Sequence, residues 1–339
     1  MPSTTAVEEL VLNPLLNVVV CSRDEVLVRF GIRSRFSHIL MDEGRTGRVG
    51  PVVRAFEKAR AAGVPATETL AQIGLDDAAI EDATEFLRER SVLVPASKDL
   101  GRVEMELLFE GDAPLDRVVL LGDGRHGTEV RRQLERLPIG TVQSLPEEAL
   151  ASDSTNGDAA DALSALGTDT DGLLVVAPDS FRPALLHRVN EVMLDLGGRW
   201  MPSIADGPTA IVGPVFMPHE GPCYAEFEIQ FEATVALRDE YLLQKEQLVQ
   251  NGSPRTDSNG GPPAAGAGFA TSPLTSALGG AWTAAWTMHA LQSTAGFNPN
   301  LALIHDYREL TVDFVEVLKL PRCPACNWGS PAYPRHLLF

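Results

Sequence analysis

Basic residues and cysteines are scarce in this chain. Only 28 of its 339 residues are Lys or Arg, against 46 Asp and Glu, and the net charge is -18. Nucleic acids and anionic membranes are bound by clustered Lys and Arg, so this charge argues against both as partners. Four cysteines in a chain of this length do not make a disulfide framework, and a reducing cytoplasm fits better.

Long apolar runs are also missing. No stretch reaches the ~20 apolar residues that a membrane-spanning helix needs. Residues 1–5 carry no charged segment followed by an apolar one, so no signal peptide is expected. The chain does have 44% hydrophobic residues, enough to bury the cores of two domains. We therefore expect a cytoplasmic protein with two domains.

Residues 1–98 are predicted to form the first, smaller domain. Three short β-branched runs separated by turn residues indicate an antiparallel meander of strands. Three helices follow, and the last begins with acidic residues and ends with basic ones, which suits the helix dipole. The predicted strands are 15–20, 26–30 and 36–41, and the helices are 49–62, 68–73 and one that begins at Asp76. Three strands followed by three short helices are typical of a winged-helix-like domain.

Residues 99–339 are predicted to form an α/β domain. A buried-type strand over 117–121 runs into Gly122, Gly124 and Gly127, and a helix over 128–137 follows. A strand, Gly-x-Gly-x-x-Gly and a helix in this order bring backbone N–H groups close to a phosphate. The alternation continues with strands at 140–144, 172–177 and 211–216 and a helix at 181–196. This pattern predicts a doubly wound, Rossmann-type sheet.

Two later segments have a distinct character. Residues 249–272 are rich in Gly, Pro, Ser and Asn, which predicts a mobile loop. A helix is expected over 276–293. The alternation over 310–318 then predicts a strand whose apolar residues point mostly inward; these are Val312, Phe314 and Val315.

The cysteines near the C-terminus suggest a metal site. Cys323 and Cys326 have the spacing of half a four-ligand structural zinc site. Cys223, which follows a Gly-Pro pair, is the obvious third ligand, but the place of its own partner cysteine holds Glu226. Glu226 or His219 would complete a mixed site, since zinc accepts nitrogen and oxygen ligands. The alternative is a site that has lost its metal and persists as packing.

In this order the motifs resemble the ThiF-like adenylating fold of ubiquitin-activating enzymes and their bacterial relatives. The residues that carry the resemblance are Gly122-x-Gly124-x-x-Gly127, 175–179, Gly213-Pro214, 221–223 and 321–326. The first domain resembles the PqqD-like domain that recognises leader peptides of ribosomally made natural products. Fused in this order, the two are similar to the ThiF-like partner proteins of thiazole/oxazole peptide clusters, which work beside a YcaO cyclodehydratase.

The chain departs from the adenylating pattern at several positions. Adenylation needs Arg or Lys aimed at the triphosphate and an acidic residue for Mg²⁺. No Lys or Arg lies between Arg136 and Arg182, and the strand 140–144 ends without the carboxylate that the resemblance would place on the ribose. Asp179 stands at the position of the family's Mg²⁺ ligand, but Ser180 follows where the family has Asn.

We therefore expect that adenylation is lost and that no ATP is bound. The nucleotide loop would then be vestigial, and its residues are Gly122, Gly124, Gly127 and Asp179. The alternative that stays open is an active ATP-dependent adenylating enzyme that acts on a peptide carboxylate.

The resemblance also implies where a peptide binds. A leader peptide would add as an extra strand beside the third strand of the small domain and pack on its third helix. The implied contact residues are Phe36, His38, Ile39 and Leu40 on the strand and Ile80, Thr84 and Leu87 on the helix. The expected function is that of a non-catalytic, activating partner of a YcaO cyclodehydratase, in the biosynthesis of a bacteriocin- or thiopeptide-type peptide with azoline or azole rings. A two-fold homodimer is also implied, because the ThiF-like fold commonly forms one.

Overall fold

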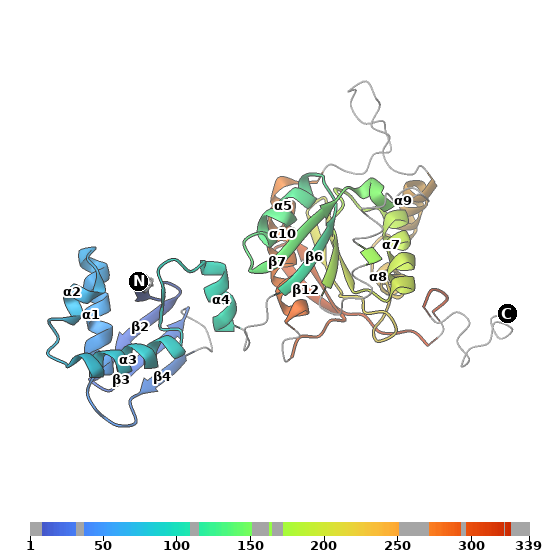
Figure 1. The fold of residues 1–339 in the computed structure, drawn as a ribbon. Coiled ribbons are helices and arrows are strands. Elements are labelled where there is room, and N and C mark those ends of the chain that lie inside the picture. The colour runs from blue at the N-terminus through green and yellow to red at the C-terminus, as the bar shows by residue number, and fades with distance from the viewer. Residues whose placement is uncertain are drawn as a thin grey trace, which may run out of the picture. The chain divides into compact units, whose positions relative to one another are not determined.

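The structure is a computed structural model that describes residues 9–31, 37–108, 115–150, 163–164, 172–250, 271–292, 296–321 and 323–326. The chain divides into two compact units, Met1–Asp112 and Ala113–Phe339, and each is described by itself (Figure 1). Phe36 and most of the predicted 249–272 loop lie outside the described residues. No helix in the described ranges combines the length and the apolar character needed to cross a bilayer.

The first unit contains the predicted three-stranded antiparallel meander. Its strands are β2 (Leu16–Val20), β3 (Glu25–Phe30) and β4 (Ser37–Met41), in the order β2-β3-β4. Val26 and Val28 of the central strand point into the core, where both are buried. Within the described chain β4 pairs with β3 alone, so its other edge is unpaired. A short strand that the sequence did not indicate, β1 (Leu10–Leu12), pairs with β5 (Leu93–Pro95).

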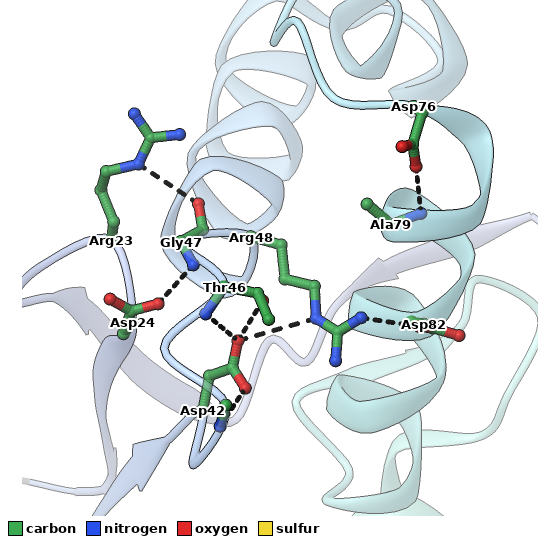
Figure 2. A network of polar contacts seen from close by, with 10 residues as sticks. Arg23, Asp24, Asp42, Thr46, Gly47, Arg48, Asp76, Ala79 and Asp82 are labelled. Atoms are coloured by element: carbon green, nitrogen blue, oxygen red, sulfur yellow. Dashed lines mark hydrogen bonds and ion pairs between the residues drawn. The ribbon is translucent and has the colours of Figure 1, made fainter.

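Helix α1 (Val49–Ala62) packs on this meander, and α2 (Ala66–Leu70) and α3 (Asp77–Glu89) pack on α1. The bounds of α1 are those predicted, because Val52, Val53 and Phe56 recur at helical spacing and are all buried. Helix α3 starts at the predicted cap, where an Asp76 carboxylate oxygen accepts the N–H of Ala79 at 2.7 Å (Figure 2).

A polar network joins the end of β4 to α3 (Figure 2). Asp42, the residue after β4, accepts the backbone N–H groups of Gly44 and Thr46 and the Thr46 hydroxyl. The hydroxyl bond lowers the pKa of Asp42. Arg48 lies between two carboxylates, with Nε 3.6 Å from Asp42 and Nη1 2.6 Å from Asp82 of α3. Arg48 thereby ties the strand and the helix of the expected peptide site to one another.

The first unit also includes a helix that the sequence placed elsewhere. Helix α4 (Leu100–Leu108) was not predicted, and the expected boundary at 98/99 assigned its residues to the second domain. Its buried residues Val103 and Leu107 pack into the core of the first unit, which extends to Asp112.

The second unit is a mixed α/β fold around a seven-stranded sheet. Its strands, in the order β12-β11-β10-β9-β8-β6-β7, are β6 (Leu115–Leu121), β7 (Ile139–Leu145), β8 (Gly172–Val176), β9 (Trp200–Asp206), β10 (Thr209–Val212), β11 (Leu301–Asp306) and β12 (Thr311–Glu316). The strands β7, β6, β8 and β9 are parallel, and β10 to β12 extend the sheet as an antiparallel meander. The α/β class is as predicted, but only the four-stranded part has the parallel arrangement of a doubly wound fold.

Helices cover both faces of this sheet (Figure 1). They are α5 (Arg125–Leu134), α7 (Pro183–Leu196), α8 (Tyr224–Glu232), α9 (Arg238–Gln250) and α10 (Pro273–Leu291). Alternate residues of β6 reach two cores: Val118 and Leu120 pack with α5 and α10, whereas Val119 and Leu121 pack with α7 and α8. All four side chains are fully buried, as expected of a strand covered on both faces.

The inward orientation predicted for the last strand is wrong. Val312 is 40% exposed and Phe314 56% exposed, although Phe314 stacks on Trp286 at a ring-centroid distance of 6.0 Å. The reason is the position of β12, which among the described residues pairs with β11 alone and forms the edge of the sheet. An alternating pattern therefore predicts a strand but does not show that its apolar side chains are buried, because an edge strand leaves them partly exposed.

Candidate functional site

Backbone packing fixes the glycine loop at the carboxyl end of β6. Gly122 has a φ of 141°, and a Cβ there would lie 2.3 Å from the carbonyl oxygen of Ala177. A Cβ on Gly127 would lie 2.3 Å from the carbonyl oxygen of Gly122. Both contacts are with main chain that has no room to move. These two glycines are therefore required by the fold itself, whether or not a nucleotide binds.

The carboxylate of Asp179 occupies the N-terminus of α5. Its two oxygens accept the N–H of Arg125 at 2.9 Å and the N–H of His126 at 2.6 Å. The helix begins here, one turn earlier than predicted, with Gly124 as a cap that has no side chain of its own. A Cβ on Gly124 would lie 2.2 Å from this carboxylate. An acidic group of the chain thus takes the position that suits an external phosphate at a helix N-terminus.

The basic residue that follows Asp179 is already paired. The guanidinium of Arg182 forms an ion pair with Glu147, in the short 3₁₀ helix Glu147–Leu150 after β7. Burial raises the pKa of Glu147, and the positive charge of Arg182 opposes that shift. The sequence analysis ended this strand at Ser144 without a carboxylate and so did not single out Glu147; β7 extends to Leu145, and Glu147 follows closely and pairs with a residue 35 positions away.

His126, within the glycine loop, is a buried neutral residue. Its Nε2 lies 2.8 Å from the Ser203 hydroxyl, which in turn lies 2.6 Å from the Thr283 hydroxyl. Gly279 of α10 makes room for the ring, since a Cβ there would lie 2.9 Å from the His126 ring. Burial lowers the pKa of His126 to about 4. The ring cannot exchange protons with solvent at neutral pH and belongs to the packing between α5, β9 and α10.

His126 should make the stability of the protein depend on pH. Its pKa is about 4 when folded and about 6.5 in an unfolded chain. Between these values the unfolded state binds more protons, so stability is complete above pH 6.5 and falls as the pH drops toward 4. We expect a loss of roughly 3 kcal/mol over that window from this residue.

Urea unfolding at about pH 7 and about pH 5 measures this dependence. The variant His126→Gln should have a flatter profile than the wild type, whereas His38→Gln, at an exposed position, should keep the wild-type slope. An unchanged slope in His126→Gln would contradict the assignment.

The structure brings the three predicted cysteines together with Glu226. The ligand atoms of Cys223, Glu226, Cys323 and Cys326 all lie within 4.8 Å of one another. The Sγ atoms of Cys223 and Cys323 are 3.6 Å apart, close to the roughly 3.8 Å expected of two thiolates on tetrahedral zinc. Of the two candidates for the fourth ligand, Glu226 belongs to this group. His219 lies outside it and contributes its carbonyl oxygen to Lys319.

Glu226 has a second role in this cluster. It is fully buried, and its two carboxylate oxygens accept the N–H of Cys223 and the N–H of Leu320, each at 2.6 Å. These bonds tie the start of α8 to the segment that leads to Cys323. The Cys326 thiol also lies 3.5 Å from the carboxylate. The Cys326 thiol lowers the pKa of Cys223 to about 7, so a thiolate, the form that binds metals, is accessible there at neutral pH, whereas burial raises the pKa of Cys323 and the hydrogen bond to Cys223 raises that of Cys326. The set fits a Cys₃Glu metal site.

The residues of the expected peptide site lie in different environments. On β4, His38 is exposed and Ile39 is 63% exposed, whereas Leu40 is half-buried against the core. On α3, Ile80 and Thr84 are half-buried. Leu87 is fully buried in the core, so its side chain does not lie on the surface of α3, where the sequence analysis placed it.

A groove of about 350 Å³ runs along α3. It contains Ile80 and Thr84, and its far wall is Leu10 of β1 rather than β4. The Thr84 hydroxyl is buried there without a hydrogen-bond partner in the described structure. The helix face and the strand edge that the sequence combined into one site therefore do not line the same groove.

Comparison with known proteins identifies the fold. No protein-family model and no curated protein matches the chain. A heterocyclase in complex with substrate and cofactor matches with a TM-score of 0.55 and 18% identity, over 95% of this chain. The heterocyclase TruD matches with a TM-score of 0.52 and 18% identity, over 94% of this chain. This chain spans 40% and 42% of those two proteins. E. coli MccB with AMPCPP and MccA gives a TM-score of 0.48 at 16% identity, over 94% of this chain and 99% of MccB. The likeness to the heterocyclases establishes a shared fold.

Proposed function

We propose that this chain is a non-catalytic, leader-peptide-binding partner of a YcaO cyclodehydratase. The complex would form azoline or azole rings in a ribosomally made peptide of the bacteriocin or thiopeptide type. In this proposal the first unit is a PqqD-like, winged-helix-like recognition domain and the second is a ThiF-like domain. Cyclodehydration is assigned to a partner polypeptide or domain outside this sequence, because the heterocyclases of the same fold are more than twice as long as the part that matches.

The position of the Asp179 carboxylate is the main support for the proposal that the chain is non-catalytic. It accepts the first N–H groups of α5, where a nucleotide phosphate would otherwise bind. A triphosphate approaching this helix would meet a negative charge instead of free donors. Arg182, the nearest basic residue in sequence, is neutralised by Glu147. Stabilising the charge that develops during adenylation requires free cationic groups at this place.

The unpaired edge of β4 supports the peptide-binding part. A peptide in extended conformation can continue the β2-β3-β4 sheet by main-chain hydrogen bonds, and side chains then provide selectivity. His38 and Ile39 are exposed on this strand. Arg48, paired with both Asp42 and Asp82, keeps the end of the strand fixed relative to α3. Such a fixed edge lowers the ordering cost of binding a flexible peptide.

Fluorescence anisotropy with labelled leader peptides tests the proposal. The peptides are the N-terminal segments encoded by short Cys/Ser/Thr-rich reading frames next to the gene. We expect a dissociation constant in the micromolar range for the full chain, and a loss of at least about tenfold in Ile39→Asp, because a charge on an edge strand opposes pairing. Val19→Asp is the matched control. Val19 aligns with Ile39 through Leu27 on the same sheet face but lies two strands away, roughly 10 Å.

The two variants decide the location of the site. Equal losses in Ile39→Asp and Val19→Asp would place the peptide on the sheet face instead of the edge. Absence of binding by every leader tested at tens of micromolar would refute leader recognition.

ATP–pyrophosphate exchange distinguishes the proposal from an adenylating enzyme. We expect no exchange above background with or without peptide, because Asp179 and Glu147 oppose triphosphate binding. The Gly-x-Gly-x-x-Gly loop still joins a strand to a helix, as in nucleotide-binding folds, so the absence of exchange has to be measured. Robust exchange would establish the alternative, an ATP-dependent enzyme acting on a peptide carboxylate.

A further inference from the structure

A small aromatic cavity lies in the second unit, between the end of the sheet and α8 and α9. Its volume is about 180 Å³, slightly larger than the ~150 Å³ engineered cavity that accepts benzene. Tyr241 of α9 forms one wall and packs between two phenylalanines. Its ring is stacked with Phe181 at 6.1 Å and perpendicular to Phe231 at 6.2 Å. The floor is made by strand residues, among them Ile204 and Ile211.

Two polar groups in this cavity have no partner in the described part of the chain. The carboxylate of Asp206, at the end of β9, forms no hydrogen bond or ion pair there, and burial raises its pKa. The hydroxyl of Tyr241 is buried and makes no hydrogen bond. The two groups are therefore not bonded to each other, although both line the cavity. Leaving the buried Tyr241 hydroxyl unsatisfied costs free energy, and the half-buried Asp206 carboxylate lines the same cavity without a partner among the described residues, so the pair points to a missing partner.

The other acidic group in the cavity is fully satisfied. Glu228 accepts hydrogen bonds from His187 and Lys245, each at 2.8 Å, and from the Tyr224 hydroxyl at 3.3 Å. Lys245 pairs in addition with Glu232 at 2.5 Å. Both carboxylates at this end thus have partners within the protein, Lys245 for Glu228 and Glu232 and His187 for Glu228, whereas the carboxylate of Asp206 has none among the described residues.

We propose that this cavity binds a small organic cation, whose apolar body fills the aromatic space and whose ammonium group bridges Asp206 and Tyr241. An ammonium group donates several hydrogen bonds and accepts none, so it can satisfy the carboxylate and the phenol oxygen together. The faces of the surrounding aromatic rings also attract a cation. A carboxylate ligand is disfavoured, because it would lie against Asp206 without a basic residue to balance it.

The cavity adjoins the glycine-loop edge without being part of it. Phe181 follows Asp179 by two residues, and β9, which ends at Asp206, runs parallel to β8. The Thr271 hydroxyl donates to the carbonyl oxygens of both Asp179 and Ala205. All residues that line the cavity belong to the second unit, whereas the proposed leader-binding edge, β4, belongs to the first. The test of the cavity is therefore separate from that of the proposed function.

Isothermal titration of the full chain with three related probes tests the site. The probes are 2-phenylethylammonium, neutral 2-phenylethanol and anionic 3-phenylpropanoate. We expect the ammonium to bind with a dissociation constant of roughly 1 mM or below, the alcohol at least about tenfold more weakly, and the carboxylate not measurably. Asp206→Asn should reduce ammonium affinity to that of the alcohol. Asp313→Asn, which removes an exposed carboxylate on β12, should leave it unchanged.

The comparison of the three probes on the wild type tests the proposal even if the Asp206→Asn variant does not fold. Equal affinity for the ammonium and the alcohol would overturn the proposal, as would the absence of ammonium binding at roughly 10 mM. Retained binding in a folded Asp206→Asn variant would overturn it as well. Tyr241→Phe, which keeps the ring and removes only the hydroxyl, should weaken the ammonium and spare the alcohol, and an unchanged ammonium affinity would remove Tyr241 from the site.

Discussion

The 339-residue chain is expected to contain one zinc ion, and Cys323→Ser is expected to lose it together with much of the stability of the second unit. The four ligand atoms lie within 4.8 Å of one another, and the Sγ atoms of Cys223 and Cys323, 3.6 Å apart, are close to the separation in tetrahedral zinc sites. Structural zinc contributes directly to folding free energy. A loss of about 3 kcal/mol would lower the unfolding temperature by roughly 10 °C in a unit of this size. Elemental analysis of the purified protein and thermal unfolding give the two readouts.

Two controls make this prediction specific. Cys21 is exposed, so Cys21→Ser should change neither zinc content nor unfolding temperature. Treatment with a chelator should lower the unfolding temperature of the wild type to that of Cys323→Ser and should not change the unfolding temperature of that variant. A wild type that carries no zinc, and whose unfolding temperature does not change with chelator, would show that the cluster is packing alone.

Substitutions at Glu226 distinguish the stability that comes from metal binding from the stability that comes from the two backbone hydrogen bonds. Its carboxylate accepts two backbone N–H groups, and the amide of Glu226→Gln can accept only one of them, because its nitrogen is a donor. Glu226→Gln should therefore remain destabilised after chelation, by roughly 1–3 kcal/mol for a buried N–H left without an acceptor. Glu226→Cys should raise zinc affinity and lose both backbone bonds.

The elements that the sequence predicted well are those with a strong local pattern. Helix α1 has its predicted bounds, and β6 is a run of apolar residues followed at once by the glycine loop. The elements that were missed have weak or contrary patterns. Strand β9 contains Pro202 and Ser203, which are typical of turns, yet it is buried between neighbouring strands. Helix α9 mixes charged and apolar residues without a clear face, so no amphipathic period was visible.

The site residues divide in the same way. Cys323 and Cys326 were recognised because metal-ligand spacing is local in sequence. The role of Asp179 was not, since its bonds to Arg125 and His126 span 54 and 53 positions and depend on how β6 and β8 are paired. Asp206 and Tyr241 gave no signal at all, because the cavity they share arises only when β9 and α9 are packed together.

Gly122→Ala is the second substitution with a large expected effect: it should prevent the second unit from folding. At a φ of 141° an alanine is strained, and its Cβ would lie 2.3 Å from the carbonyl oxygen of Ala177. Neither that carbonyl nor the loop can move, because the Ala177 N–H bonds to Leu121 and the Gly122 N–H bonds to Leu145. We expect a destabilisation of more than about 4 kcal/mol, seen as insoluble protein or loss of cooperative unfolding.

Gly197→Ala provides the matched comparison. Gly197 ends α7 with a φ of 74°, and a Cβ there would meet nothing within 4 Å. Gly197→Ala should lower the free energy of unfolding by about 1–2 kcal/mol, because alanine is strained in the left-handed conformation but meets no clash. The excess in Gly122→Ala measures the clash between β6 and β8, and it should be the same with and without ATP. A Gly122→Ala protein as stable as Gly197→Ala would mean that the backbone moves to relieve the clash, and one rescued by ATP would mean that the loop is held by a nucleotide. The expected result, an ATP-independent loss, means that these glycines persist because the sheet requires them, so the motif by itself is evidence of fold and not of adenylation.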